Sequence, residues 1–317
     1  FSFDFFMDIA SLDESTRSLL LIIQEIVPEN TFVVSVDMVK QIMRDTKQEI
    51  VEVARLLCIY LSMSSTVAPI SHFSAGAVVI GSTGTMYIGF NIEYLQSPLS
   101  ETIHAEQCAI SNAVIHKEPK IEHIVTIPTP CGHCRQFIRE CSQAKDIMVH
   151  SCNNETGAFL FHLPLLEVLP YSFGPEDLGC TSGIMDVNGK KCIINARTLP
   201  SCEDNDKAIQ YALENLPKSH SPHSKSWCSV VILWTQNEVK KFSTGVYLEN
   251  AAYNPSLGAL QCALVDLLIE KGSFSDICSV IVFEDNTAQV QHFTKTKLLL
   301  DIIAPSASVH LQNVQIS

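Results

Sequence analysis

The chain of 317 residues is poor in basic side chains. Its 21 lysines and arginines stand against 34 aspartates and glutamates, so the formal net charge is −13. No cluster of lysine and arginine interrupts this balance. Because an acidic surface repels phosphate backbones, the composition argues against polymeric nucleic acid as a partner.

Long apolar runs are also missing, since none reaches the roughly 18 uncharged residues that a membrane helix needs. The longest candidates, 18–27 and 50–63, carry Glu25 and then Glu52 and Arg55. The aromatic and acidic start lacks the basic region of a signal peptide. The twelve cysteines lie in apolar stretches, which indicates reduced, buried thiols rather than a disulfide framework. We therefore expect a cytoplasmic protein without membrane contact.

Enough apolar material is present for real cores, because 46% of the residues are hydrophobic. The length favours two domains. Alternating strand-like and helix-like runs, with helices expected at 48–63 and at about 131–141 among others, predict a layered α/β fold. We expect an N-terminal helical segment at 1–48, a first α/β domain at 49–161, a linker with several prolines and glycines at 162–203, and a second domain at 204–317.

The second half of the chain repeats part of the first. The alignment joins three pairs of segments, which begin at Pro69 and Pro222, at Gly89 and Gly245, and at His104 and Gly258. In the last pair, His-Ala-Glu-Gln-Cys-Ala-Ile stands opposite Gly-Ala-Leu-Gln-Cys-Ala-Leu, so the second copy lacks the histidine and the glutamate. It also has no Cys-x-x-Cys. Only the first copy can therefore carry metal chemistry of this kind.

Two cysteines, Cys131 and Cys134, stand three apart at the start of a predicted helix, so their sulfurs can turn to one point. The N-terminus of a helix also favours thiolates. A Cys-x-x-Cys taken alone leaves a metal site, a redox pair or neither open. His104, at the head of another predicted helix, supplies a third candidate ligand. Three protein ligands with one open position are typical of catalytic zinc.

Other candidate site residues have plainer interpretations when each is taken alone. Glu106 is then an ordinary first-turn glutamate, stabilised by the helix dipole. Asn91 and Glu93, two apart on a predicted strand, share a face that could simply be solvated. Phe73 is by default a core aromatic, and His133, between the two cysteines, is interpreted as a supporting residue rather than a ligand.

The order H-x-E followed by P-C-x-x-C is the signature of the zinc deaminases. The chain resembles the homodimeric, two-domain cytidine deaminases in six segments, which are 68–73, 89–93, 103–107, 129–137, 169–178 and 249–255. This resemblance implies a three-layer α/β/α cytidine-deaminase-like sheet that is duplicated, with a catalytic zinc deaminase domain and a degenerate, non-catalytic copy. It also implies Zn²⁺ held by His104, Cys131 and Cys134, with Glu106 moving the protons.

The resemblance assigns further residues to the substrate. It implies that Asn91 and Glu93 hold the ribose 3'-hydroxyl and that Phe73 packs on the pyrimidine ring. The Ala105 amide and the Thr129 carbonyl would address the base and the departing ammonia. The implied reaction is the hydrolytic deamination of cytidine and deoxycytidine to uridine and deoxyuridine, in pyrimidine salvage.

Three residues are implied to act between chains. Phe173, Ala252 and Tyr253 would reach over the pocket of a partner subunit, so the resemblance predicts a homodimer. Without that role, the degenerate copy would be scaffold alone.

Two other functions stay open at this point. One is a deaminase that acts on another base, or on RNA or DNA, and the other is a non-catalytic nucleoside-binding protein. The acidic composition and the pair Asn91 and Glu93 favour a free nucleoside as the substrate, and the intact H-x-E and P-C-x-x-C favour catalysis.

Overall fold

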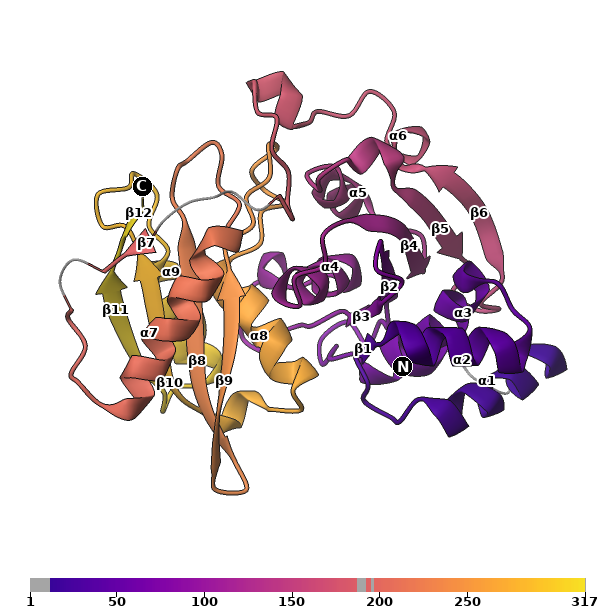
Figure 1. The fold of residues 1–317 in the computed structure, drawn as a ribbon, viewed down its shortest axis with the longest axis horizontal. Coiled ribbons are helices and arrows are strands. Elements are labelled where there is room, and N and C mark those ends of the chain that lie inside the picture. Colours follow the sequence, from indigo (N-terminus) through magenta and orange to yellow (C-terminus); the bar gives the residue numbers. More distant parts are fainter. Residues whose placement is uncertain (1–11, 187–191, 195–196, 317) are drawn as a thin grey trace. The chain divides into compact units, whose positions relative to one another are not determined.

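Figure 1 shows the computed structural model, which describes residues 12–186, 192–194 and 197–316. Contacts divide the chain into two units. One takes the described residues up to Tyr94 together with Pro98–Gly174, and the other takes Leu95–Ser97 and Pro175–Ser317. The aromatic and acidic start of the chain lies outside the described residues. Within them, every helix is too short or too polar to cross a bilayer.

Two helices, α1 (Glu14–Ile26) and α2 (Val36–Thr46), begin the first unit. A side chain caps the start of each helix by accepting a hydrogen bond from a backbone amide of the first turn. This side chain is Asp13 for α1 and Ser35 for α2. Each also buries an apolar stripe and leaves its polar side exposed. These are the α-helices of residues 12–48, the part of the predicted N-terminal segment that the structure describes.

A six-stranded mixed sheet forms the middle of the first unit, in the order β1-β3-β2-β4-β5-β6. Strands β4 and β5 are parallel, and the other neighbours are antiparallel. The strands are β1 (Val33–Val34), β2 (Gly76–Gly81), β3 (Met86–Phe90), β4 (Ile121–Ile127), β5 (Met148–Cys152) and β6 (Phe159–Pro164).

Helices cover both faces of this sheet. Helix α4 (Ala105–Ile115) packs on β3 and β2, and α3 (Ile50–Leu57) packs on the opposite face. Gly89 permits the first contact, because a Cβ there would lie 2.3 Å from the carbonyl oxygen of Ala105. The unit is therefore the three-layer α/β/α arrangement that the sequence implied.

The second unit contains a four-stranded sheet in the order β11-β10-β8-β9, with β10 and β11 parallel. Helices α7 and α8 lie on opposite faces of it. The elements are β7 (Cys192–Ile193), α7 (Glu203–Asn215), β8 (Cys228–Gln236), β9 (Val239–Val246), α8 (Ala259–Ile269), β10 (Ile277–Glu284), α9 (Phe293–Ile303), β11 (Ser308–Asn313) and β12 (Gln315–Ile316).

The internal repeat is a repeat of structure. The order β9-β8-β10-β11 reproduces β3-β2-β4-β5, with the same parallel pair at the end. Gly245 meets α8 as Gly89 meets α4, since an added Cβ would lie 2.1 Å from the amide nitrogen of Ala263. The side chains of Gln107 and Gln261 also accept the backbone amide at the start of their helices in the same way.

Three expected boundaries differ from the structure. The helix predicted at 48–63 is α-helical only to Leu57 and continues as a π-helical turn, Cys58–Ser62. Helix α5 (Gly132–Ile138) ends before Cys141, whose amide closes a tight turn onto Ile138. The segment 162–203, predicted as a linker, contains the end of β6, helix α6 (Leu165–Val168) and β7, which pairs with the distant β12.

Candidate metal centre

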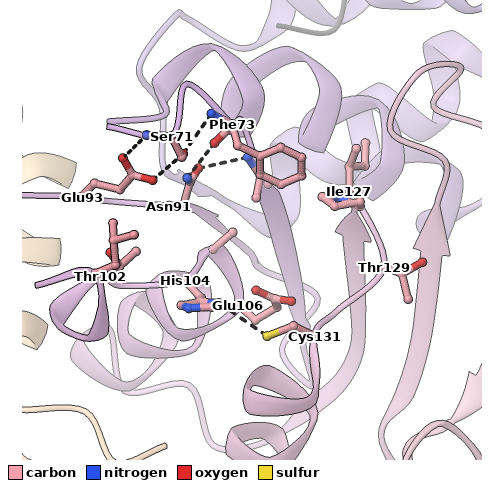
Figure 2. A pocket seen from close by; sticks show the side chains of 15 residues that line it. Ser71, Phe73, Asn91, Glu93, Thr102, His104, Glu106, Ile127, Thr129 and Cys131 are labelled. Atoms are coloured by element: carbon pink, nitrogen blue, oxygen red, sulfur yellow. Dashed lines mark hydrogen bonds between the residues drawn. The ribbon is translucent and has the colours of Figure 1, made fainter. Parts of the chain in front are cut away.

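Three candidate ligands converge at the starts of two helices. His104 is the N-cap residue of α4, and Cys131 is the N-cap residue of α5, with Cys134 in its first turn. One potential ligand atom from each of the three lies within 4.8 Å of the others. Figure 2 shows His104, Glu106 and Cys131 gathered at one side of a cavity.

The two thiols are in opposite electrostatic situations. The pKa of Cys131 is lowered to about 3, mainly by a hydrogen bond from the Cys134 side chain. His104 Nδ1, which lies 3.6 Å from the Cys131 sulfur, also lowers this pKa. Burial is the main cause that raises the pKa of Cys134 well above its ordinary value. These surroundings favour the thiolate form of Cys131 and the thiol form of Cys134, so a metal that binds both sulfurs would have to replace the proton on Cys134.

This donor set fits zinc. One imidazole nitrogen and two sulfurs are soft or borderline ligands, which Zn²⁺ prefers to the all-oxygen sets of magnesium or calcium. His133 supports the arrangement, because its ring stacks on that of His104 with centroids 4.9 Å apart and planes at 24°. Its position matches the supporting role predicted from the sequence.

Glu106 lies beside these ligands in the first turn of α4. Its side chain is buried, and its Oε2 accepts a hydrogen bond from Cys134 Sγ at 3.1 Å. Burial raises the pKa of this carboxyl above its ordinary value. A carboxyl group so placed can hold a proton within reach of a molecule in the cavity.

The cavity beside the ligands has a volume of about 400 Å³. That size suits a small molecule rather than a polymer segment. It is enclosed by the loop before β2, the end of β3, the start of α4 and the loop after β4. Its lining residues are Ser71, Phe73, Ala75, Gly76, Asn91, Glu93, Leu99, Thr102, His104, Ala105, Glu106, Ile127, Pro128, Thr129 and Cys131.

Asn91 and Glu93 line this cavity and are both buried. They lie opposite the candidate ligands in Figure 2. The backbone pairing of Ile92 with Ile103 fixes that position, because it holds the segment after β3 beside the start of α4. The alternative of a solvated strand face is therefore excluded for these two side chains.

Both side chains also hold the loop before β2. Glu93 accepts hydrogen bonds from the backbone amides of Ile70 and Ser71, each at 3.0 Å, and one from the Ser71 hydroxyl. Asn91 donates to Phe73 O at 2.8 Å and accepts from Ala75 N at 3.0 Å. The loop that carries Phe73 is thus fixed by the same groups that face the cavity.

The other predicted substrate residues divide into two groups. Phe73, Ala105 and Thr129 line the cavity, and Phe73 leaves 37% of its surface exposed. Phe173 and Tyr253 do not line it and expose 45% and 63% of their surfaces.

Ala252 and Tyr253 belong to the second unit and are likewise absent from the lining of the cavity.

Sequence reasoning missed two polar lining residues, Ser71 and Thr102. Their closeness to Phe73 and His104 in the sequence was the only available signal.

In the second copy, a histidine side chain lies at the position that corresponds to the cavity of the first copy. Tyr247 and Ser226 are the counterparts of Asn91 and Phe73, and both contact His292. The rings of Tyr247 and His292 are 4.4 Å apart, and His292 Nε2 lies 3.1 Å from Ser226 Oγ. His292 therefore lies where the first copy has its cavity.

Comparison with known proteins gives matches over both halves of the chain. Two family models described as "Cytidine and deoxycytidylate deaminase zinc-binding region" match residues 51–151 and 165–297. The chain is 36% identical to the cytidine deaminase of Vibrio cholerae over 252 residues, which is 79% of each chain. It is 37% identical to that of Vibrio vulnificus over 242 residues, or 76% of each, and 36% identical to that of Photobacterium profundum over 251 residues, or 79% of each.

We predict one zinc per chain, bound in the first domain. His104→Ala or Cys131→Ala should abolish zinc retention, because two protein ligands are left where catalytic sites use three. Glu106→Gln is the matched control and should keep its zinc, since this carboxylate is not among the predicted ligands. Metal analysis of purified protein checks this. Full zinc content in His104→Ala, or zinc bound by residues 204–317, would contradict it.

Proposed function

The chain belongs to the cytidine and deoxycytidylate deaminase family, and we propose that its first domain hydrolyses the 4-amino group of cytidine and deoxycytidine in pyrimidine salvage. The products are ammonia and uridine or deoxyuridine, and the cofactor is Zn²⁺. The observation that carries this proposal is the convergence of His104, Cys131 and Cys134 beside Glu106 in one small-molecule cavity.

Glu106 is proposed to perform the proton transfers. The contribution of zinc, when bound, is Lewis acidity that makes water a stronger acid. Glu106 receives a proton from the attacking water and delivers it to N3 of the pyrimidine. It then takes the remaining proton from the hydroxyl group added at C4 and gives it to the amine, which leaves as ammonia while the C4 carbonyl forms. Its burial and raised pKa suit a group that must both accept and release a proton.

Asn91 and Glu93 are proposed to hold the ribose 3'-hydroxyl. A carboxylate has about four acceptor sites, and an amide nitrogen has two donors. Three of the sites of Glu93 and one donor of Asn91 are used within the loop before β2. One acceptor and one donor therefore remain, which is the pair that a hydroxyl group needs.

The free nucleoside is favoured over the two alternatives. A deaminase of RNA or DNA would bind a phosphate backbone, and the net charge of −13 opposes this. A non-catalytic binding protein would not need a thiolate, a buried thiol and a buried carboxyl at one point. The second copy, with His292 in the equivalent place, illustrates that non-catalytic state.

We also propose a homodimer in which Phe173, Ala252 and Tyr253 complete the partner's cavity. The exposure of the Phe173 and Tyr253 side chains supports a role between subunits. Closed two-fold dimers are the commonest assembly. The free state of all twelve cysteines in the described residues supports a reducing compartment, and we propose the cytoplasm.

Glu106→Gln should lose at least about 10²-fold in turnover while keeping its zinc, because the amide cannot move protons. Ammonia release from cytidine by the full chain measures this. A variant that retains more than about a tenth of the normal rate would contradict the assigned role.

Removing the 3'-hydroxyl from the substrate should lower kcat/KM about as much as removing the side chain proposed to bind it. The analogue 3'-deoxycytidine should lose roughly tenfold to hundredfold in kcat/KM, because a hydrogen bond to a charged group is lost. Asn91→Ala should show a loss of similar size with cytidine but little further loss with the 3'-deoxy analogue. The control substrate 2'-deoxycytidine should stay active. Equal turnover of 3'-deoxycytidine and cytidine would refute the assignment.

The shared cavity can be tested by complementation. Tyr253→Ala should have reduced activity, and His104→Ala should have none. In a mixed dimer, the cavity of the Tyr253→Ala subunit receives an intact Tyr253 from its partner. Activity of the co-expressed variants should therefore exceed the mean of the two measured separately. Activity equal to that mean would show that Tyr253 acts within its own chain or not at all.

A further inference from the structure

The second unit contains a cavity of about 380 Å³ that the proposed reaction does not use. It lies between residues 178–182 and the loop before β8. Among the described residues that line it, none is aspartate or glutamate, although the chain as a whole carries 34 of them. Its lining residues are Leu178, Gly179, Cys180, Thr181, Ser182, His220, Ser221, Pro222, His223, Lys225 and Trp227.

The loop that forms one wall is held in place from behind. His220 pairs through its backbone with Tyr247 and Glu249, at 2.9 and 2.7 Å. The Glu249 carboxylate accepts the backbone amides of His223 at 2.8 Å and Ser224 at 3.2 Å. The carboxylate of Glu249 is therefore engaged by backbone amides, and this wall is shaped before any ligand binds.

The hydroxyl of Ser221 is the strongest sign of a ligand. The residue is 1% exposed, and its Oγ has no hydrogen-bond partner among the described residues. Burial of a hydroxyl without a partner is unfavourable, so such groups call for an explanation. Ser221 lines the cavity together with Thr181, Ser182 and the cation Lys225. Hydroxyl donors beside a cation are the groups that bind an oxyanion.

Comparison of the two repeats shows that three polar residues of this loop are found only in the second copy. Alignment at Pro69 and Pro222 places His220, Ser221 and His223 opposite Val67, Ala68 and Ile70. The same alignment places Trp227 opposite Ser74. Glu93 and Glu249 hold the two loops through equivalent backbone amides, so the loops share one framework. Three apolar positions of the first copy are thus polar in the second copy, and one serine position carries an aromatic ring.

We propose that this cavity binds a small phosphate-bearing ligand, with Ser221 and Lys225 contacting the phosphate group. The volume falls in the range of small-molecule sites, about 300–1,000 Å³. The phosphate can belong to inorganic phosphate or to a nucleoside monophosphate, with Trp227 beside the remainder of the molecule. This site lies in the domain without metal ligands and is independent of the proposed reaction.

Fluorescence of the full chain tests the proposal with inorganic phosphate, cytidine monophosphate and cytidine as probes. Trp227 lines the cavity, whereas the other tryptophan, Trp234, is fully buried in the core. Inorganic phosphate or the monophosphate should produce a saturable change that Trp227→Phe removes. Tighter binding of the monophosphate would identify a nucleotide site, and equal binding would identify a free-phosphate site. Cytidine should not reproduce the change.

Variants separate specific from general effects. Ser221→Ala and Lys225→Gln should each weaken binding by about tenfold or more, since each removes a charge-assisted contact. Lys297→Gln is the matched control, because Lys297 lies on α9 and pairs with Asp301 away from the lining residues. Three results would overturn the proposal. One is a fluorescence signal that does not change in a saturable way with either phosphate probe, and another is an equal fluorescence change with cytidine. The third is an unchanged affinity for phosphate in both Ser221→Ala and Lys225→Gln.

Discussion

The close contact between α4 and β3 is the constraint on which the candidate site depends. Gly89 allows the start of α4 to approach the strand so closely that any side chain there would collide with Ala105. His104 and Glu106 stand at that helix start, and Asn91 and Glu93 follow the same strand. One packing contact therefore fixes the positions of the predicted ligand His104 and of Glu106 relative to the proposed sugar-binding pair.

The duplicated unit shows that this packing does not depend on the chemistry. The second copy keeps the glycine at β9, the glutamine at the start of α8 and the glutamate after β9, in the same contacts. It has lost every predicted ligand, and His292 lies in place of the cavity. The scaffold is thus separable from the reaction, which leaves the second copy open to other ligands or to an interface.

Much of the site could be predicted because its residues are close in sequence. His104, Glu106, Cys131 and Cys134 belong to short motifs at helix starts, whose geometry follows from local structure. The hydrogen bonds of Asn91 and Glu93 to the loop before β2 could not be predicted, since they join residues about twenty positions apart.

Other features depend on contacts between distant parts of the chain. The pairing of β7 with β12 gives structure to part of a segment whose composition indicated only a linker. The π-helical turn after Leu57 interrupts an apolar period that predicts a continuous helix. Such features arise from tertiary packing, which local periodicity does not report.

X-ray absorption at the zinc edge tests the central claim most directly, because it counts the atoms around the metal in the intact chain. Two sulfurs at about 2.3 Å, one imidazole nitrogen at about 2.0–2.1 Å and one further light atom are expected from Cys131, Cys134, His104 and an open position. Four sulfur ligands, or a spectrum without sulfur, would contradict a three-ligand catalytic site in the first domain.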